Sequence, residues 1–284
     1  MQMPTLPPRA IDAHPRDRAD LQRAVALLEA PTITARMANL VGAPLEFAVK
    51  RLPDGVTRRI HGAVEAALHK AVQTALWSMD NTPGRAASPR WHKLAAATTG
   101  AVGGAFGFTA LLVELPVSTT IMMRAVADVA RSEGFDLRDL ATRQACLEVF
   151  ALGGNSGSDD ASETGYYLAR GFTADVVRHL SAELAGRVAT GQGLTLGVAP
   201  KEAGKLLAKL VEKVAARFGV VVGEKFAAQA VPVIGAAAGA TLNTMFTDYY
   251  QDVARGHFIV RRLEKTYGET AVREAYDRIA AGRD

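Results

Sequence analysis

The sequence has few of the residues that build disulfides and zinc sites. Cys146 is the one cysteine among 284 residues, so an intramolecular disulfide is excluded, as is common in a reducing compartment. It lies in the apolar run ACLEVF with no cation beside it, which predicts a buried structural thiol. The six histidines are scattered and form no H-x-x-x-H or E-x-x-H pair. This argues against zinc-protease and ferritin-type di-iron chemistry.

Strand signals and aromatic residues are also scarce. Alternating Val, Ile and Thr runs are few, no Asn-Gly hairpin turn occurs, and helical periodicity dominates. We therefore predict an all-α fold. The expected helices are 17–30, 33–50, 55–79, 93–113, 117–133, 138–152, 160–188, 200–217, 220–230, 233–266 and 269–281. Aromatic residues are 6% of the chain, so stacking platforms for nucleic acid are lacking.

Charge and termini suggest the cellular setting. Lys and Arg number 33 against 29 Asp and Glu, giving a net charge of +4. This mild excess permits attraction to anionic lipid or phosphate. Residues 1–16 are rich in Pro and Arg and have no apolar signal-peptide core, which predicts a loosely packed tail before one helical domain at 17–284. The expected location is cytoplasmic, with the inner-membrane surface as an alternative.

Two segments lack charge over membrane-like lengths, at 94–113 and 226–247. Both are built mainly from Ala, Gly and Thr, which contribute little to transfer into lipid. Glycines at close spacing allow two helices to approach closely in lipid or in a soluble core. We expect a closely packed central pair of helices, and shallow insertion into a bilayer is the alternative.

Several motifs together resemble one family. They include PTITARMANLVGAPLEFAVKRLPDGV, ELPVSTTIMMRAVADVARSEG, CLEVFALGG, DDASETGYYLAR, VPVIGAAAGATLNTMF and HFIVRRLEKTYG. In this combination the chain resembles the EcsC family over about residues 31–268. The resemblance implies an intracellular bacterial protein with a role near a membrane. It brings no agreed activity, so function has to be argued from the residues.

The segment 151–170, ALGGNSGSDDASETGYYLAR, is the most unusual stretch. Asp160 and Glu163 fit a D-x-x-E capping box at a helix start, and capping alone is one explanation for them. The alternative is a site, because a fixed cation and two tyrosines follow on the same helix face and would orient an anionic head group. The candidate catalytic residues are Asp159, Asp160, Glu163, Tyr167 and Arg170.

Glu114 and Glu148 lie in apolar helical runs. A buried carboxylate needs a cation, a metal ion or a proton. If these glutamates converge with the carboxylates near 160, all-oxygen ligands without histidine suit Mg²⁺ or Mn²⁺. A buried ion pair of Glu114 with Arg124 or Arg170 is an equal alternative.

The D-D-x-x-E spacing is also similar to the aspartate-rich motif of all-helical terpene synthases. Asn243, Thr247 and Gln251 resemble the second metal motif of those enzymes, although Gln251 replaces an expected glutamate. The full set of candidate metal ligands is Glu114, Glu148, Asp159, Asp160, Glu163, Asn243, Thr247 and Gln251. Short motifs of this kind also arise by chance.

A basic stripe recurs every four residues in KEAGKLLAKLVEKVAARF and faces a Leu/Val side. Its members are Lys201, Lys205, Lys209, Lys213 and Arg217. A basic amphipathic helix suits an anionic membrane surface, and an ordinary solvated face is the alternative.

Two functions follow from these patterns. The first is binding of an apolar or lipid-like ligand, with or without a (di)phosphate, beside a carboxylate-held Mg²⁺ or Mn²⁺ ion. A more specific version of this first function is a Mg²⁺-dependent enzyme that acts on a prenyl diphosphate. The second is a non-enzymatic accessory protein that docks on a membrane through the basic stripe.

Overall fold

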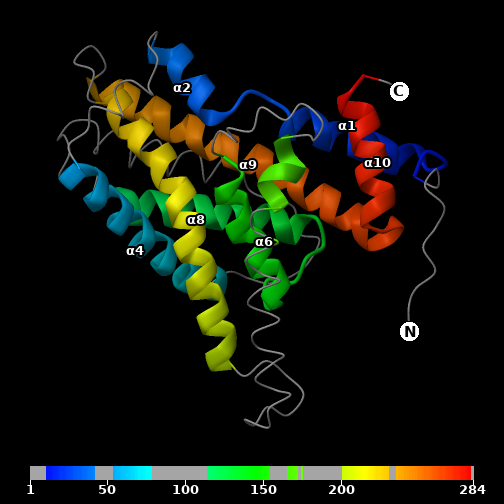
Figure 1. Cartoon of the computed structure of the whole chain (residues 1–284), viewed down its shortest axis with the longest axis horizontal. Coiled ribbons are helices and arrows are strands. Elements are labelled where there is room, and N and C mark those ends of the chain that lie inside the picture. Colours follow the sequence, from blue (N-terminus) through cyan, green and yellow to red (C-terminus); the bar gives the residue numbers. More distant parts are fainter. Residues whose placement is uncertain are drawn as a thin grey trace.

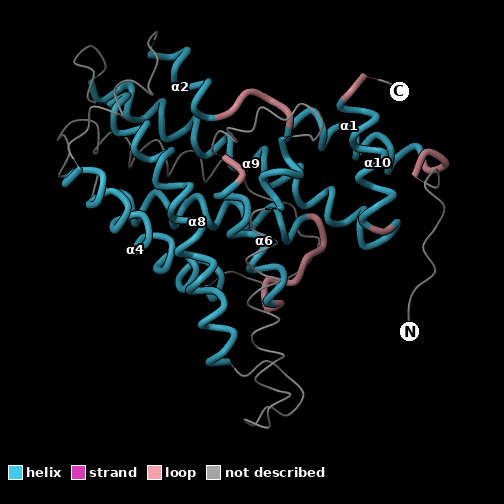
Figure 2. The backbone as a smooth tube through the Cα atoms, viewed as in Figure 1, coloured by secondary structure: helices cyan, strands magenta, loops and turns pink. Residues whose placement is uncertain are grey.

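The computed structural model describes residues 11–41, 54–78, 114–153, 165–171, 174, 200–229 and 235–282. Every regular element in these ranges is an α-helix, which confirms the all-α prediction (Figures 1 and 2). Within the described ranges, no helix is both long and apolar enough to cross a membrane. The buried thiol is also confirmed, because Cys146 is fully enclosed and burial raises its pKa to about 12.

Seven helices have both ends among the described residues. They are α1 (Pro15–Leu28), α2 (Ile33–Val41), α4 (Asp54–Ser78), α6 (Leu140–Ala151), α8 (Pro200–Gln229), α9 (Gly235–Tyr267) and α10 (Glu269–Ala280). Residues 114–132 and 165–171 are also helical. The helices α4, α6, α9 and α10 each begin and end within two residues of the predicted bounds.

The predicted break between 217 and 220 is wrong, because α8 continues through Gly219. A Cβ built on Gly219 would lie 2.5 Å from Nδ1 of His61 on α4. The glycine therefore serves the close approach of α8 to α4 and does not end the helix. Its cost in a helix, about 1 kcal/mol, is offset by burial of neighbours such as Phe218 and Val222.

The long helix α9 runs across the molecule and joins two groups of helices (Figure 1). At one end α1 and α10 pack on its C-terminal half. At the other end α4 lies along α8, and α6 packs against both α8 and α9. Gly256 permits close contact with α1, because a Cβ there would lie 2.6 Å from Cγ of Leu28.

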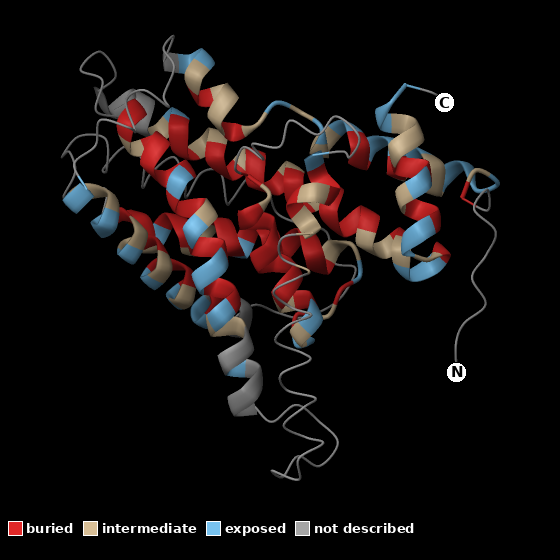
Figure 3. Cartoon of the chain, viewed as in Figure 1, coloured by how far each residue is buried: buried red, intermediate tan, exposed pale blue. Residues whose placement is uncertain are grey.

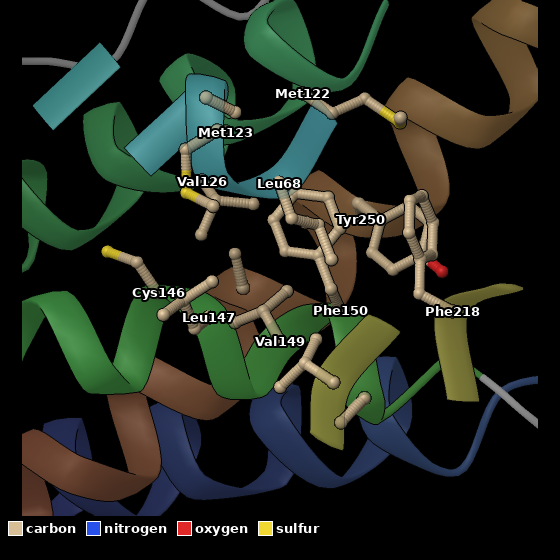
Figure 4. Packing of buried hydrophobic residues seen from close by; sticks show 14 of the residues in the cluster. Leu68, Met122, Met123, Val126, Cys146, Leu147, Val149, Phe150, Phe218 and Tyr250 are labelled. Atoms are coloured by element: carbon tan, nitrogen blue, oxygen red, sulfur yellow. The ribbon is translucent and has the colours of Figure 1, made fainter. Parts of the chain in front are cut away.

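The main core lies between α4, α6, α8, the helical residues 114–132 and the first half of α9. Buried residues line the inward sides of these helices, and nearly the whole of α6 is buried (Figure 3). Phe150 of α6 stacks on Tyr250 of α9 and meets Phe218 of α8 edge-on (Figure 4). A second core cluster lies between α1, α10, the end of α9 and two tyrosines of the 165–171 segment.

The helical domain begins earlier in the sequence than the predicted residue 17. Ile11 is buried in the second core cluster, Asp12 contacts Arg278 at 3.0 Å, and α1 already begins at Pro15. The described part of 1–16 therefore belongs to the helical domain. The uncharged segment 226–247 contains the end of α8 and the start of α9, so it is not one spanning helix. Its proposed partner, 94–113, lies outside the described residues.

Candidate functional site

Three sequence blocks that lie far apart in the chain converge on one buried polar chain. The hydroxyl of Tyr166 lies 3.0 Å from Nδ1 of His257, and Nε2 of that histidine lies 3.5 Å from Oε2 of Glu148. Nη1 of Arg261 is 3.2 Å from the same carboxylate oxygen. The hydroxyl of Tyr166 thus shares a hydrogen bond with Nδ1, whereas Nε2 is buried near the carboxylate without a hydrogen-bond partner.

Burial sets the charge states of the side chains in this polar network. It lowers the pKa of His257 well below the usual value, and the nearby cations Arg261 and Arg170 act in the same direction. Burial also raises the pKa of Glu148, opposed by Arg261 and Arg170. The neutral imidazole is held by its hydrogen bond with the Tyr166 hydroxyl and by burial next to Glu148. It orients Tyr166.

The buried imidazole makes stability depend on pH. We expect the free energy of unfolding to fall as the pH drops below 6.5, by up to about 1.4 kcal/mol per pH unit, because the unfolded histidine takes up a proton and the folded one does not. His257→Phe removes this dependence. Urea unfolding of both proteins from pH 7.5 to 5.5 measures it.

Two features make this comparison specific. The raised pKa of Glu148 acts with the opposite sign, stabilising the fold at low pH, and this contribution is shared by wild type and variant. His69→Phe, on the half-buried face of α4, is the matched control and is expected to keep the wild-type pH dependence. Parallel curves for wild type and His257→Phe would contradict the assignment.

Arg170, predicted to orient an anionic head group, is engaged within the protein. Its two terminal nitrogens donate to the two carboxylate oxygens of Glu264 at 2.5 and 2.8 Å. The hydroxyl of Tyr167 lies 3.5 Å from the same carboxylate. An anion at Arg170 would have to displace Glu264, and the catalytic role of Tyr167 and Arg170 stays a prediction.

Glu114 lies in a second buried network. Nζ of Lys225 is 3.4 Å from its Oε1, and Nδ2 of Asn243 donates to the same oxygen at 2.5 Å. Lys225 also donates to Oδ1 of Asn243. Burial lowers the pKa of Lys225, and the Glu114 carboxylate opposes this shift. The cation that pairs with Glu114 is thus Lys225 from α8, in place of the predicted Arg124 or Arg170.

The predicted metal ligands are placed only in part. Among the described residues, no group of three or more His, Cys, Asp or Glu side chains could hold a metal ion. Thr247 and Gln251 are buried on α9, one and two turns after Asn243. The carboxylates Asp159, Asp160 and Glu163 lie outside the described residues. A Mg²⁺ or Mn²⁺ site around them stays a prediction.

The basic stripe is described in its second half. Lys209 and Lys213 are exposed on α8, and Arg217 is half-buried, which lowers its pKa. The opposite, apolar face of α8 packs inside the protein, with Leu210 and Val214 fully buried. That face is therefore not available to a membrane. The side chains of Lys201 and Lys205 lie outside the described residues.

A pocket of about 280 Å³ lies beside Tyr166. It is bounded by the end of α1 and the turn to α2, by α9, by the 165–171 segment and by Leu152 after α6. The described lining residues are Leu28, Glu29, Ala30, Pro31, Thr32, Leu152, Gly165, Tyr166, Ala169, Tyr249 and Val253. Apolar and tyrosine side chains form most of its wall, which is typical of small-molecule sites.

The Gly153-Gly154 pair follows Leu152 at the end of α6. Gly153 permits a close approach within the protein, since an added Cβ would lie 2.4 Å from the hydroxyl of Tyr250. The preceding residue, Leu152, lines the pocket. Gly154 lies outside the described residues.

Sequence analysis did not predict the network residues Lys225, His257, Arg261 and Glu264 as partners of the buried carboxylates and tyrosines. A signal was present for Lys225, a lone cation in the apolar run VVVGEKFAAQAV. The other three lie at i, i+4 and i+7 on one face of α9. That spacing indicates a polar face on the helix. It does not indicate which side chains from distant segments contact this face.

The fold and these contacts define an all-helical protein with buried ion-pair networks beside a small, largely apolar pocket. The EcsC protein family matches residues 20–263 of the 284. The chain therefore belongs to the EcsC protein family. Comparisons with curated proteins and with solved structures found no significant match.

Proposed function

We propose that this EcsC protein binds a small apolar or lipid-like molecule in the pocket beside Tyr166. The observation that carries the proposal is the pocket itself, about 280 Å³ with a wall of Leu28, Leu152, Val253 and two tyrosines. This volume is near the lower end of ligand sites, about 300–1,000 Å³. It suits a short chain or one end of a longer lipid.

The wall is held in place by the buried networks, which supports binding to a preformed site. Tyr166 is fixed by His257 on α9, and its segment is fixed by the two hydrogen bonds from Arg170 to Glu264. Preorganised walls reduce the entropy lost on binding. The described lining contains no His, Cys, Lys or Arg, so the proposal is binding without a chemical step.

Filling the pocket tests the proposal. We expect n-octanol at ten times its dissociation constant to stabilise the wild type by about 1.4 kcal/mol, a rise in melting temperature of roughly 2–5 °C. Ala30→Trp places a large ring at the half-buried rim of the pocket and is expected to abolish this rise. Differential scanning fluorimetry and calorimetric titration measure both effects.

Ala35→Trp is the matched control, since Ala35 is also half-buried but does not line the pocket. It is expected to retain binding. Equal binding by Ala30→Trp and wild type would place the ligand elsewhere. A wild type that binds no octyl probe would overturn the proposed function.

We propose surface docking on anionic membranes as a second function. Lys209 and Lys213 are exposed on α8, and Val220, two turns after Lys213, is 50% exposed on the same side. Because the apolar face of α8 is in the core, the attraction would be mainly electrostatic and screened by salt. It would not involve insertion of the helix.

Flotation with liposomes containing anionic lipid tests docking. We expect binding at low salt, loss of binding at high salt, and loss in the double variant Lys209→Glu, Lys213→Glu. The control is Arg16→Glu, Arg23→Glu on α1, which changes the net charge equally at two exposed positions. If both double variants float alike, α8 is a solvated face.

A further inference from the structure

We infer that the pocket beside Tyr166 selects a ligand with a positively charged end, an amine or a quaternary ammonium on a short apolar body. This inference rests on the proposed function and names the chemistry of its ligand. It departs from the phosphate-bearing ligand that the carboxylate motifs suggested.

The lining of the pocket carries one formal negative charge, and Arg36 brings one positive charge to the rim. Of the eleven described lining residues, Glu29 alone carries a charge. The hydroxyl of Tyr276 donates to Oε1 of Glu29 at 2.7 Å, which orients the carboxylate and leaves Oε2 available to a ligand. A carboxylate at the rim of an apolar pocket attracts an organic cation and repels phosphate or carboxylate groups.

The backbone adds to this negative potential. Leu28, Glu29 and Ala30 form the C-terminal end of α1 and its cap, where helix carbonyl groups carry partial negative charge. No basic side chain lies in the last turn of α1 to neutralise it. A cation in the pocket would therefore meet both the carboxylate and the negative end of the helix.

The tyrosine rings provide the remaining attraction. Tyr166 and Tyr249 line the pocket, and aromatic faces bind ammonium and guanidinium groups. The protein already uses this chemistry at the rim. The guanidinium of Arg36 lies 5.1 Å from the ring centre of Tyr249, and its Nε donates to the carbonyl of Pro31 at 3.0 Å. The surroundings of the pocket thus already hold one cation.

Three probes with one chain length separate charge from apolar binding: octyltrimethylammonium, n-octanol and octanoate, each below its micellar concentration. By calorimetric titration we expect the ammonium to bind tightest and octanoate weakest. Glu29→Gln keeps an acceptor for Tyr276 but removes the charge, and is expected to weaken ammonium binding about fivefold with octanol unchanged. The matched control is Glu274→Gln at an exposed site on α10.

The outcomes are distinct. Ammonium selectivity that is reduced by Glu29→Gln and kept by Glu274→Gln supports the inference. Octanol binding with no preference for ammonium, or a preference that survives in Glu29→Gln, overturns it and leaves the proposed function intact. If none of the three probes binds, the proposed function fails, and this inference fails with it.

Discussion

Replacing Glu114 with leucine is expected to lower the free energy of unfolding by about 3–5 kcal/mol, because Lys225 would then be buried without a carboxylate, either as an unpaired ammonium or after losing its proton. Lys225 is 3% exposed and its contacts are Glu114, Asn243 and the ring of Phe246 at 5.3 Å. Asparagine and phenylalanine stabilise a cation but do not neutralise it. Chemical denaturation at pH 7 measures the loss.

The double variant Glu114→Leu, Lys225→Met should recover part of that loss, and the remainder reflects the buried Asn243 amide, which loses these two partners. Replacing a buried ion pair with apolar side chains of similar volume is often neutral or stabilising, since both desolvation costs disappear. One oxygen of Glu114, Oε2, is buried without a hydrogen-bond partner, which makes the native pair costly to begin with. A double variant less stable than Glu114→Leu would contradict this interpretation.

An exposed pair gives the control. Nη2 of Arg138 lies 3.1 Å from Oδ2 of Asp136, and the Arg138 side chain is 78% exposed. Arg138→Met is expected to leave the free energy of unfolding almost unchanged, because solvent screens this pair. A loss as large as that of Glu114→Leu would mean that burial does not set the cost.

Local sequence patterns predicted the helices because the apolar spacing that defines a helix face lies within a few residues. The same reasoning identified Glu114 and Glu148 as buried carboxylates in need of a cation. It could not identify Lys225 or Arg261, each more than 100 residues away, because only the packing of α8 and α9 brings them close. The prediction of a helix break at Gly219 was wrong because the role of this glycine depends on His61 of another helix.

The pocket was hidden from sequence reasoning for the same reason. Its wall combines the turn after α1, one side of α9 and the short segment 165–171. None of these carries a recognisable binding motif on its own. The recognisable motif in this region is the group of carboxylates at 159–163, which precedes that segment in the chain and lies outside the described residues.

Replacing Glu264 with alanine is the second change with a large expected effect. It removes the two carboxylate oxygens of Glu264 to which Arg170 donates, and the Arg170 side chain is 14% exposed. Unlike a buried lysine, an arginine does not lose its proton, so the guanidinium would stay charged. We expect the free energy of unfolding to fall by about 2–4 kcal/mol.

The effect should also be local. Residues 165–171 carry Tyr166 and Ala169 of the pocket wall, and Arg170 ties this segment to α9. We expect faster amide hydrogen exchange in 165–171 and weaker binding of n-octanol in Glu264→Ala, with exchange in α4 unchanged. Glu274→Ala, at an exposed site on α10, is the matched control and should affect neither. Normal exchange and binding in Glu264→Ala would show that the pocket wall is held without this ion pair.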